Sequence, residues 1–308
     1  GETVFMLNGT EPYTPPAIQI FRGKIQGEEK SKVVLTVIDG NITGMVQHED
    51  GNRYIMSPSV NSKKDAREHL LYNESAVTLP TTEREFQCFT TDDLLEDHGI
   101  HPKSKFTPQE RTLSNDLLLV DLALDMDFGL FKRLNPDPET ADPENVYKYV
   151  FPLIAMVSSI YEDEINVTFR ISYFNVWTDT DPYEAGGDIS VMLDNFSKYW
   201  SSKRGGISRA VAHLVTGPGS TFVGGIAYRD QLCNKSRYGG YSVSGVRASY
   251  TYPTLNYTWD VNVIAHEIGH NFASPHTHMC GFWGPQPLDT CVSRKIQPVA
   301  DDACFDFA

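Results

Sequence analysis

One segment, Trp259 to His276, constrains this 308-residue chain more than any other. Its first half is largely apolar, which is typical of a buried helix. In a helix, residues four positions apart return to nearly the same face, so His266 and His270 direct their imidazoles at one point and Glu267 lies beside them. The spacing therefore predicts two metal ligands with an adjacent carboxylate.

A third ligand is expected from the residues that follow this helix. Pro275 disfavours helical angles in the residue before it, so the chain turns and brings His276 toward the same point. His278 is an alternative, because alternate residues of an extended segment share a face, but we favour His276. Three histidines leave the fourth coordination position of a zinc ion open for water.

The constellation predicts hydrolysis with one catalytic zinc ion. Zinc lowers the pKa of a bound water to about 7 and polarises a carbonyl, while Glu267 takes the proton as general base and passes it to the leaving amine. Peptide bonds are the natural substrate of this chemistry. The alternative, core histidines on an amphipathic helix, requires several polar groups to find partners on an apolar segment.

The chain is predicted to contain two domains. Residues 1–111 are expected to be β-rich, because two apolar runs flank Asp39-Gly40 in the manner of a β-hairpin. The polar stretch at 90–114 lacks hydrophobic periodicity and is interpreted as part of a linker. Residues 112–308 form the second domain.

The second domain alternates between strand and helix patterns, which predicts an α/β layered fold. A buried strand is expected at 117–125, further strands at 167–177, 211–215 and 225–228, and helices at 146–162 and 191–201.

The segment from His266 to His276 resembles the metzincin signature His-Glu-x-x-His-x-x-Gly-x-x-His at every position except the glycine, where Ala273 stands. Residues 119–161 and 211–217 resemble the catalytic domain of the adamalysin/reprolysin-like family, as do two further stretches, 177–183 and 224–234. The resemblance implies a twisted, mostly parallel sheet with helices and an active-site helix. It also implies an antiparallel edge strand, here 224–228, that binds extended protein or peptide substrates by strand addition.

The resemblance extends to the first domain, where Phe21 to Pro58 is similar to a reprolysin-type propeptide. It implies a latent proenzyme whose own propeptide covers the cleft, with the activating cleavage between about 100 and 112. Lys103, Lys105 and Arg111 give no unique cleavage site. Cys88 has two interpretations: its thiolate occupies the open zinc position, or it has a structural or disulfide role.

The sequence departs from the family pattern at three places. Ala273 stands where a left-handed backbone favours glycine, at a cost of about 1 to 2 kcal/mol. Thr277 stands where adamalysins usually have aspartate. The family's Met-turn is not recognised between Cys280 and Ala308, and we expect it beyond Ala308. A binding module without activity, or a zinc enzyme acting on other substrates, remain the rival interpretations.

Charge and covalent features indicate the compartment. The net charge of -14 argues against nucleic acid and anionic membranes as partners, and no apolar run is long enough to span a bilayer. Seven Asn-x-Ser/Thr triplets and five cysteines predict a secreted, disulfide-containing glycoprotein; the triplets begin at Asn8, Asn41, Asn73, Asn166, Asn195, Asn234 and Asn256. An acidic, proline-rich loop has two interpretations, a calcium site or a solvated surface loop, and we favour the second because the oxygen ligands lack the spacing of a recognised calcium loop. Its carboxylates are Asp137, Glu139, Asp142 and Glu144.

Overall fold

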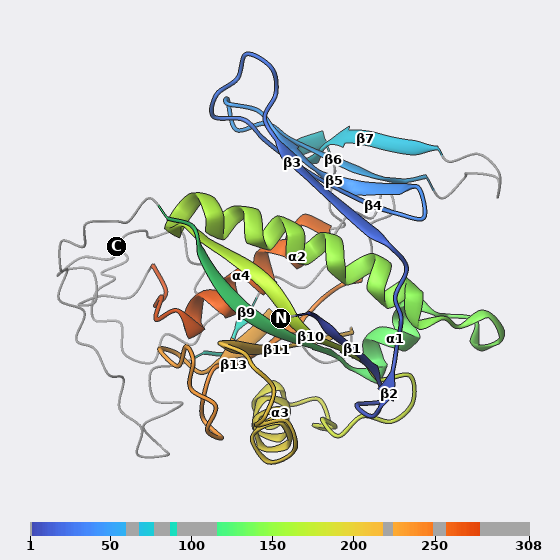
Figure 1. Ribbon diagram of the computed structural model, residues 1–308, viewed down its shortest axis with the longest axis vertical. Coiled ribbons are helices and arrows are strands. Elements are labelled where there is room, and N and C mark those ends of the chain that lie inside the picture. Colours follow the sequence, from blue (N-terminus) through green and yellow to red (C-terminus); the bar gives the residue numbers. More distant parts are fainter. Residues whose placement is uncertain are drawn as a thin grey trace, which may run out of the picture.

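The computed structural model describes residues 2–59, 68–76, 87–90, 116–217, 224–248 and 257–277. They form two β-sheets with a long helix between them (Figure 1). Within these residues, no helix is both long and apolar enough to cross a membrane.

The larger sheet is mixed and mostly parallel, as the family resemblance implies. Its eight strands lie in the order β2-β1-β10-β9-β11-β13-β12-β8. Five neighbouring strands are parallel: β1 (Val4–Leu7), β10 (Val167–Val176), β9 (Leu118–Met126), β11 (Val211–Thr216) and β13 (Tyr241–Gly245). At the ends of the sheet, β2 (Glu11–Pro12) is antiparallel to β1, β12 (Gly224–Ala227) is antiparallel to β13, and β8 (Gln87–Cys88) is parallel to β12.

Helices cover both faces of this sheet (Figure 1). One face carries α2 (Pro143–Ile165) and α4 (Tyr257–Asn271), which share one hydrophobic cluster. The other face carries α3 (Ile189–Lys203), which packs in a second cluster. The short helix α1 (Phe128–Leu134) follows β9 directly. This arrangement places α4 beside β12 and β13.

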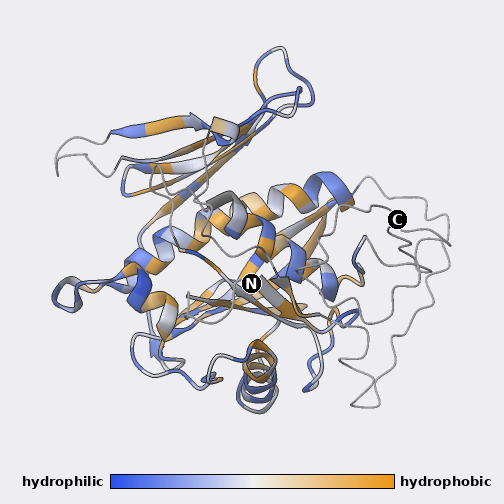
Figure 2. Cartoon of the chain, turned by 180° about the vertical axis from the view of Figure 1, so that it is seen from behind, coloured by the Kyte–Doolittle hydropathy of each residue, from blue (hydrophilic) through white to orange (hydrophobic). Residues whose placement is uncertain are grey.

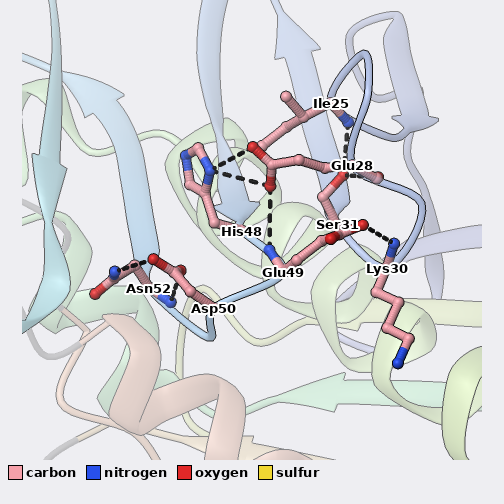
Figure 3. Close-up of polar contacts among 8 residues, drawn as sticks. All are labelled: Ile25, Glu28, Lys30, Ser31, His48, Glu49, Asp50 and Asn52. Carbon is pink, nitrogen blue, oxygen red and sulfur yellow. Dashed lines mark hydrogen bonds and ion pairs between the residues drawn. The ribbon is translucent and has the colours of Figure 1, made fainter.

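The smaller sheet is an antiparallel meander of five strands: β3 (Ile18–Gly23), β4 (Lys32–Ile38), β5 (Asn41–Gln47), β6 (Arg53–Pro58) and β7 (His69–Asn73). The predicted hairpin is confirmed, because Asp39 and Gly40 both adopt positive φ between β4 and β5. At one end of the sheet, the Glu28 carboxylate accepts hydrogen bonds from His48 Nδ1 and the Glu49 amide, which ties two loops together (Figure 3).

Helix α2 joins the two sheets. A helix that is apolar on most of its circumference must be buried, and fourteen of its residues are buried. Hydrophobic residues recur along it between the sheets (Figure 2). Val34 and Ile38 of the smaller sheet share its hydrophobic cluster, and ion pairs add to the contact: Arg22–Glu162, Lys32–Asp163 and Lys148–Asp39.

Residues 1–111 contribute strands to both sheets. Strands β3 to β7 form the smaller sheet, whereas β1, β2 and β8 join the larger one. The division of the chain at residue 111 stays a prediction. The strand predicted to be buried at 117–125 is buried only in its second half: Leu118 and Leu119 are 58 % and 57 % exposed, and Leu122 is fully buried.

Candidate active site

Helix α4 places two of the predicted ligands together. His266 and His270 lie one turn apart on the same face, and their ring centroids are 4.6 Å apart. Asn271, at the end of the helix, donates to the Tyr228 and Tyr241 carbonyls at 2.8 Å and 3.0 Å. These bonds fix the helix end to the sheet, so the two histidines are held by rigid elements.

The turn after α4 brings His276 to the same place. Ala273 has φ 72°, so the expected left-handed residue is observed. Its amide donates to the His270 carbonyl at 2.9 Å, and the Ser274 amide donates to the Gly269 carbonyl at 3.0 Å, which is the Schellman pattern of a helix end. The His276 ring lies 4.8 Å from that of His270 and 5.4 Å from that of His266.

Replacing Ala273 with glycine should raise the free energy of unfolding by about 1 kcal/mol, because glycine adopts the left-handed conformation without the side-chain penalty. Chemical denaturation of both chains measures the change. Ala185, in an irregular loop without positive φ, provides the matched Ala→Gly control. An unchanged or lowered stability for the Ala273 variant contradicts the strain argument.

Cys88, at the end of β8, completes a group of four potential ligands. One ligand atom from each of Cys88, His266, His270 and His276 lies within 4.8 Å of the other three. Cys88 Sγ is 3.4 Å from His270 Nε2, which is 3.0 Å from His266 Nε2. Its sulfur lies among the predicted ligands and its thiol is free. This position agrees with the interpretation of Cys88 as a zinc ligand, and the choice between the two interpretations stays a prediction.

These donors fit a zinc ion. Imidazole and thiolate are the ligands that zinc takes in proteins, and four of them suit its tetrahedral preference. His270 Nδ1 lies 2.7 Å from the Ser274 carbonyl, a contact that requires the proton on Nδ1 and leaves Nε2 free to bind a metal. Burial, with His266 and His276 nearby, lowers the pKa of His270 well below its ordinary value and favours the neutral, metal-binding form.

Glu267 lies beside this group and is fully buried. Burial raises its pKa well above the ordinary value, whereas a nearby divalent cation favours the carboxylate. One oxygen, Oε2, is 3.4 Å from Thr90 Oγ1, and Oε1 has no hydrogen-bond partner among the described residues. Gly225 makes room for it, because a Cβ there would lie 2.6 Å from Glu267 Cδ.

The predicted edge strand, β12, is covered by residues 87–90. Strand β8 pairs with Gly224 and Gly225 in parallel, and the Phe89 amide donates to the Gly225 carbonyl at 2.9 Å. Thr90 Oγ1 then accepts from the Ala227 amide at 2.8 Å. A segment of the first 111 residues therefore occupies both the outer edge of β12 and the space beside Glu267.

Other residues of types that could bind metals or carry chemistry lie away from the four clustered ligands. His213 is buried in β11, with Nδ1 2.7 Å from Ser242 Oγ, and is not among the four clustered ligands. Asp137 and Asp142 cap helices, and Glu144 pairs with Lys148. Cys233 is an exposed free thiol. Several residues named from the sequence lie outside the described ranges: Lys103, Lys105, Arg111, Asn256 and His278, together with three of the five cysteines, Cys280, Cys291 and Cys304.

The sequence analysis missed two residues that shape the site. Thr90 contacts both Glu267 and β12, and nothing in its local sequence marks it. Asp260 is fully buried on α4 and accepts hydrogen bonds from Tyr149 Oη and from the backbone amides of Arg247 and Ala248. Burial raises the pKa of Asp260 to about 7. An acidic residue inside an otherwise apolar helix was the available signal.

Comparison with known proteins agrees with this geometry. The reprolysin profile of metallo-peptidase family M12 matches residues 119–301, which include the three histidines and Glu267. The chain belongs to metallo-peptidase family M12. The M12 match includes strands β9 to β13 and helices α1 to α4.

Individual M12 relatives are distant. Disintegrin and metalloproteinase domain-containing protein 19 of Mus musculus is 24 % identical over 267 residues, covering 84 % of this chain and 27 % of that protein. Zinc metalloproteinase-disintegrin-like atrase-A of Naja atra is 24 % identical over 284 residues, covering 89 % and 43 %. The chain thus spans less than half the length of these relatives. Among solved structures, metalloproteinase-II of Bacteroides fragilis aligns over 91 % of this chain and 84 % of that one, with 12 % identity and a TM-score of 0.40.

Proposed function

We propose that this chain is a zinc-dependent endopeptidase that hydrolyses peptide bonds of proteins, in a latent form. The convergence of His266, His270 and His276 within 4.8 Å of one another, with Glu267 buried beside them, carries the proposal. These three histidines would hold one zinc ion. The metal supplies a Lewis acid that polarises the scissile carbonyl and makes water acidic enough to lose a proton near pH 7.

Glu267 is proposed as the general base and later the general acid. Its Oε1, which has no hydrogen-bond partner in the part of the chain that the structure describes, is available to accept a proton. Oε2 is positioned by Thr90 only while residues 87–90 are in place. A carboxylate enclosed by protein exchanges protons with a bound substrate more readily than with bulk water.

Substrate is proposed to bind along β12. A short strand at the border of a sheet offers backbone donors and acceptors to an extended peptide, and here the Gly225 carbonyl and the Ala227 amide already bond to residues 89 and 90. This observation favours peptides over other hydrolysable substrates.

Latency is proposed to come from residues 87–90. Cys88 provides a fourth ligand at the position that catalysis requires to be open, and β8 covers the border of β12. We further propose that residues 1–111 are the propeptide, that the linker near Lys103 to Arg111 is cleaved on activation, and that the glycosylation triplets reflect a secretory route. Asn8 is excluded as an acceptor of a glycan, because its Nδ2 bonds to Thr178 Oγ1.

Zinc content and peptide cleavage together test the function. We expect one zinc per chain by atomic spectroscopy, and cleavage of a quenched peptide after the chain is cut in the linker and the N-terminal fragment is separated from the remainder. His276→Ala should bind zinc less tightly by at least roughly 10-fold, the loss that changing even an outer-shell partner of a metal site causes. The matched control is His48→Ala, because His48 follows β5 of the smaller sheet, bonds to Glu28 (Figure 3) and is not among the clustered ligands. Stoichiometric zinc without cleavage favours the binding module, and no zinc contradicts the site.

A further inference from the structure

We propose that the larger sheet carries a second peptide-binding site, distant from the zinc ligands, whose occupant is the chain's own segment Thr3–Tyr13. This segment forms β1 and β2 and borders β10, at the end of the sheet opposite β8. If residues 1–111 are a propeptide, as proposed above, the segment clasps the propeptide to the catalytic part independently of Cys88.

Backbone pairing sets the register of the clasp. Residues Val4 to Leu7 pair in parallel with Tyr173 to Val176. The Asn8 amide continues the pattern by donating to the Val176 carbonyl at 3.0 Å, and Thr3 Oγ1 donates to the Ile171 carbonyl at 2.6 Å. The Phe5 ring packs against three aromatic rings of α2 and β10 with centroid distances of 6.0 to 6.1 Å, namely Tyr147, Phe151 and Phe174.

Side chains make the site selective for an Asn-Gly sequence. Asn8 Oδ1 accepts from the Thr178 amide at 2.9 Å, and Asn8 Nδ2 lies 3.0 Å from Thr178 Oγ1. The Gly9 amide donates to Asn175 Oδ1 at 2.7 Å. Asn175 is fully buried, and its Nδ2 is held by Asp125 Oδ1 at 2.8 Å, so its acceptor oxygen points at the clasp. These contacts exceed what sheet pairing alone requires.

The turn at Asn8-Gly9 explains why residue 9 is a glycine. Asn8 and Gly9 have φ of 50° and 72°, the conformation of a tight hairpin turn that Asn-Gly favours. The Gly9 carbonyl accepts from Arg204 Nη2, at the end of α3. A Cβ on Gly9 would collide with that guanidinium and lie 3.3 Å from Tyr199 Oη. A side chain at residue 9 would therefore displace the Arg204 guanidinium, and the bond from Arg204 to the carbonyl of residue 9 would be lost.

The clasp predicts that cutting the linker does not by itself release the first 111 residues. The test uses the whole chain with the recognition sequence of a site-specific protease inserted between Lys103 and Arg111. The chain is cut at that sequence, the N-terminal fragment is labelled, and the sample is diluted until the two fragments separate. Gly9→Ala should raise the dissociation constant by about 10-fold or more. Gly27→Ala is the matched control, since Gly27 also has positive φ, at 89°, but nothing lies within 4 Å of an added Cβ.

Two further arms keep the test independent of folding and of catalysis. Arg204→Gln alters the receiving surface and should weaken binding in the same direction, with thermal unfolding showing that each chain is folded. Cys88→Ser removes the sulfur at the histidines, and the difference between the Gly9 and Gly27 variants should persist in it. The assay measures the association of the two fragments and not proteolysis by this chain. Its result on the clasp therefore remains valid if the proposed protease activity is absent. Dissociation of the Gly9 and Arg204 variants equal to that of the Gly27 variant overturns the clasp.

Discussion

Glu267→Gln should reduce peptide cleavage about 10²- to 10⁴-fold in the chain that has been cut and freed of its N-terminal fragment, the usual contribution of a general acid–base group. Glutamine has the same shape and fits the room made by Gly225, while the amide cannot accept and return the proton. Steady-state cleavage of a quenched peptide gives kcat and KM separately, and the loss is expected in kcat with KM nearly unchanged.

Zinc content separates this loss from a loss of the site. The glutamine variant should still bind one zinc per chain, because Glu267 is not among the four clustered ligands. Glu164→Gln, on an exposed residue near the end of α2, is the matched control and should leave cleavage unchanged. Full activity in the Glu267 variant would rule out its proposed role.

Cys88→Ala should activate the uncut chain roughly tenfold or more. A ligand that occupies the open position reduces the fraction of competent molecules, so removing it raises the apparent activity by the inverse of that fraction. Activation is expected to be incomplete, because Phe89 and Thr90 still bond to β12.

The matched control is Cys233→Ala, which removes the other free thiol that the described residues contain, an exposed one. It should leave the uncut chain as inactive as the parent. Equal activity of both variants before the cut, with normal activity of both after it, would assign latency to strand pairing rather than to the sulfur.

The sequence was most informative where the spacing of the functional residues matches the period of the helix that carries them. His266, Glu267 and His270 could be placed because helical periodicity alone sets their relation. His276 and the left-handed Ala273 followed from Pro275 and from the family signature. The helices α2 and α3 were found from apolar residues at helical spacing, and strands β9, β10 and β11 from their apolar runs. The short strand β12 was named from its resemblance to the family's edge strand.

Features that depend on distant partners were not predictable. Strand β13 was not predicted. It contains Ser242 and Ser244, yet both are fully buried beneath α4, where Ser244 Oγ lies 3.3 Å from the Val263 carbonyl. The pairing of β8 with β12 joins segments without any shared pattern. The Asn8-Gly9 turn was visible as a dipeptide, but its partners at 175–178 and 204 were not.

The position of β1 also has a consequence for how the chain acquires its structure. Asn8 meets Thr178 across 170 residues of sequence, whereas the smaller sheet pairs only neighbours along the chain. Loop closure of that length is slow relative to hairpin formation. During synthesis the smaller sheet can therefore form first, and the amino-terminal strand must wait, unpaired, until β10 and the residues after it have left the ribosome.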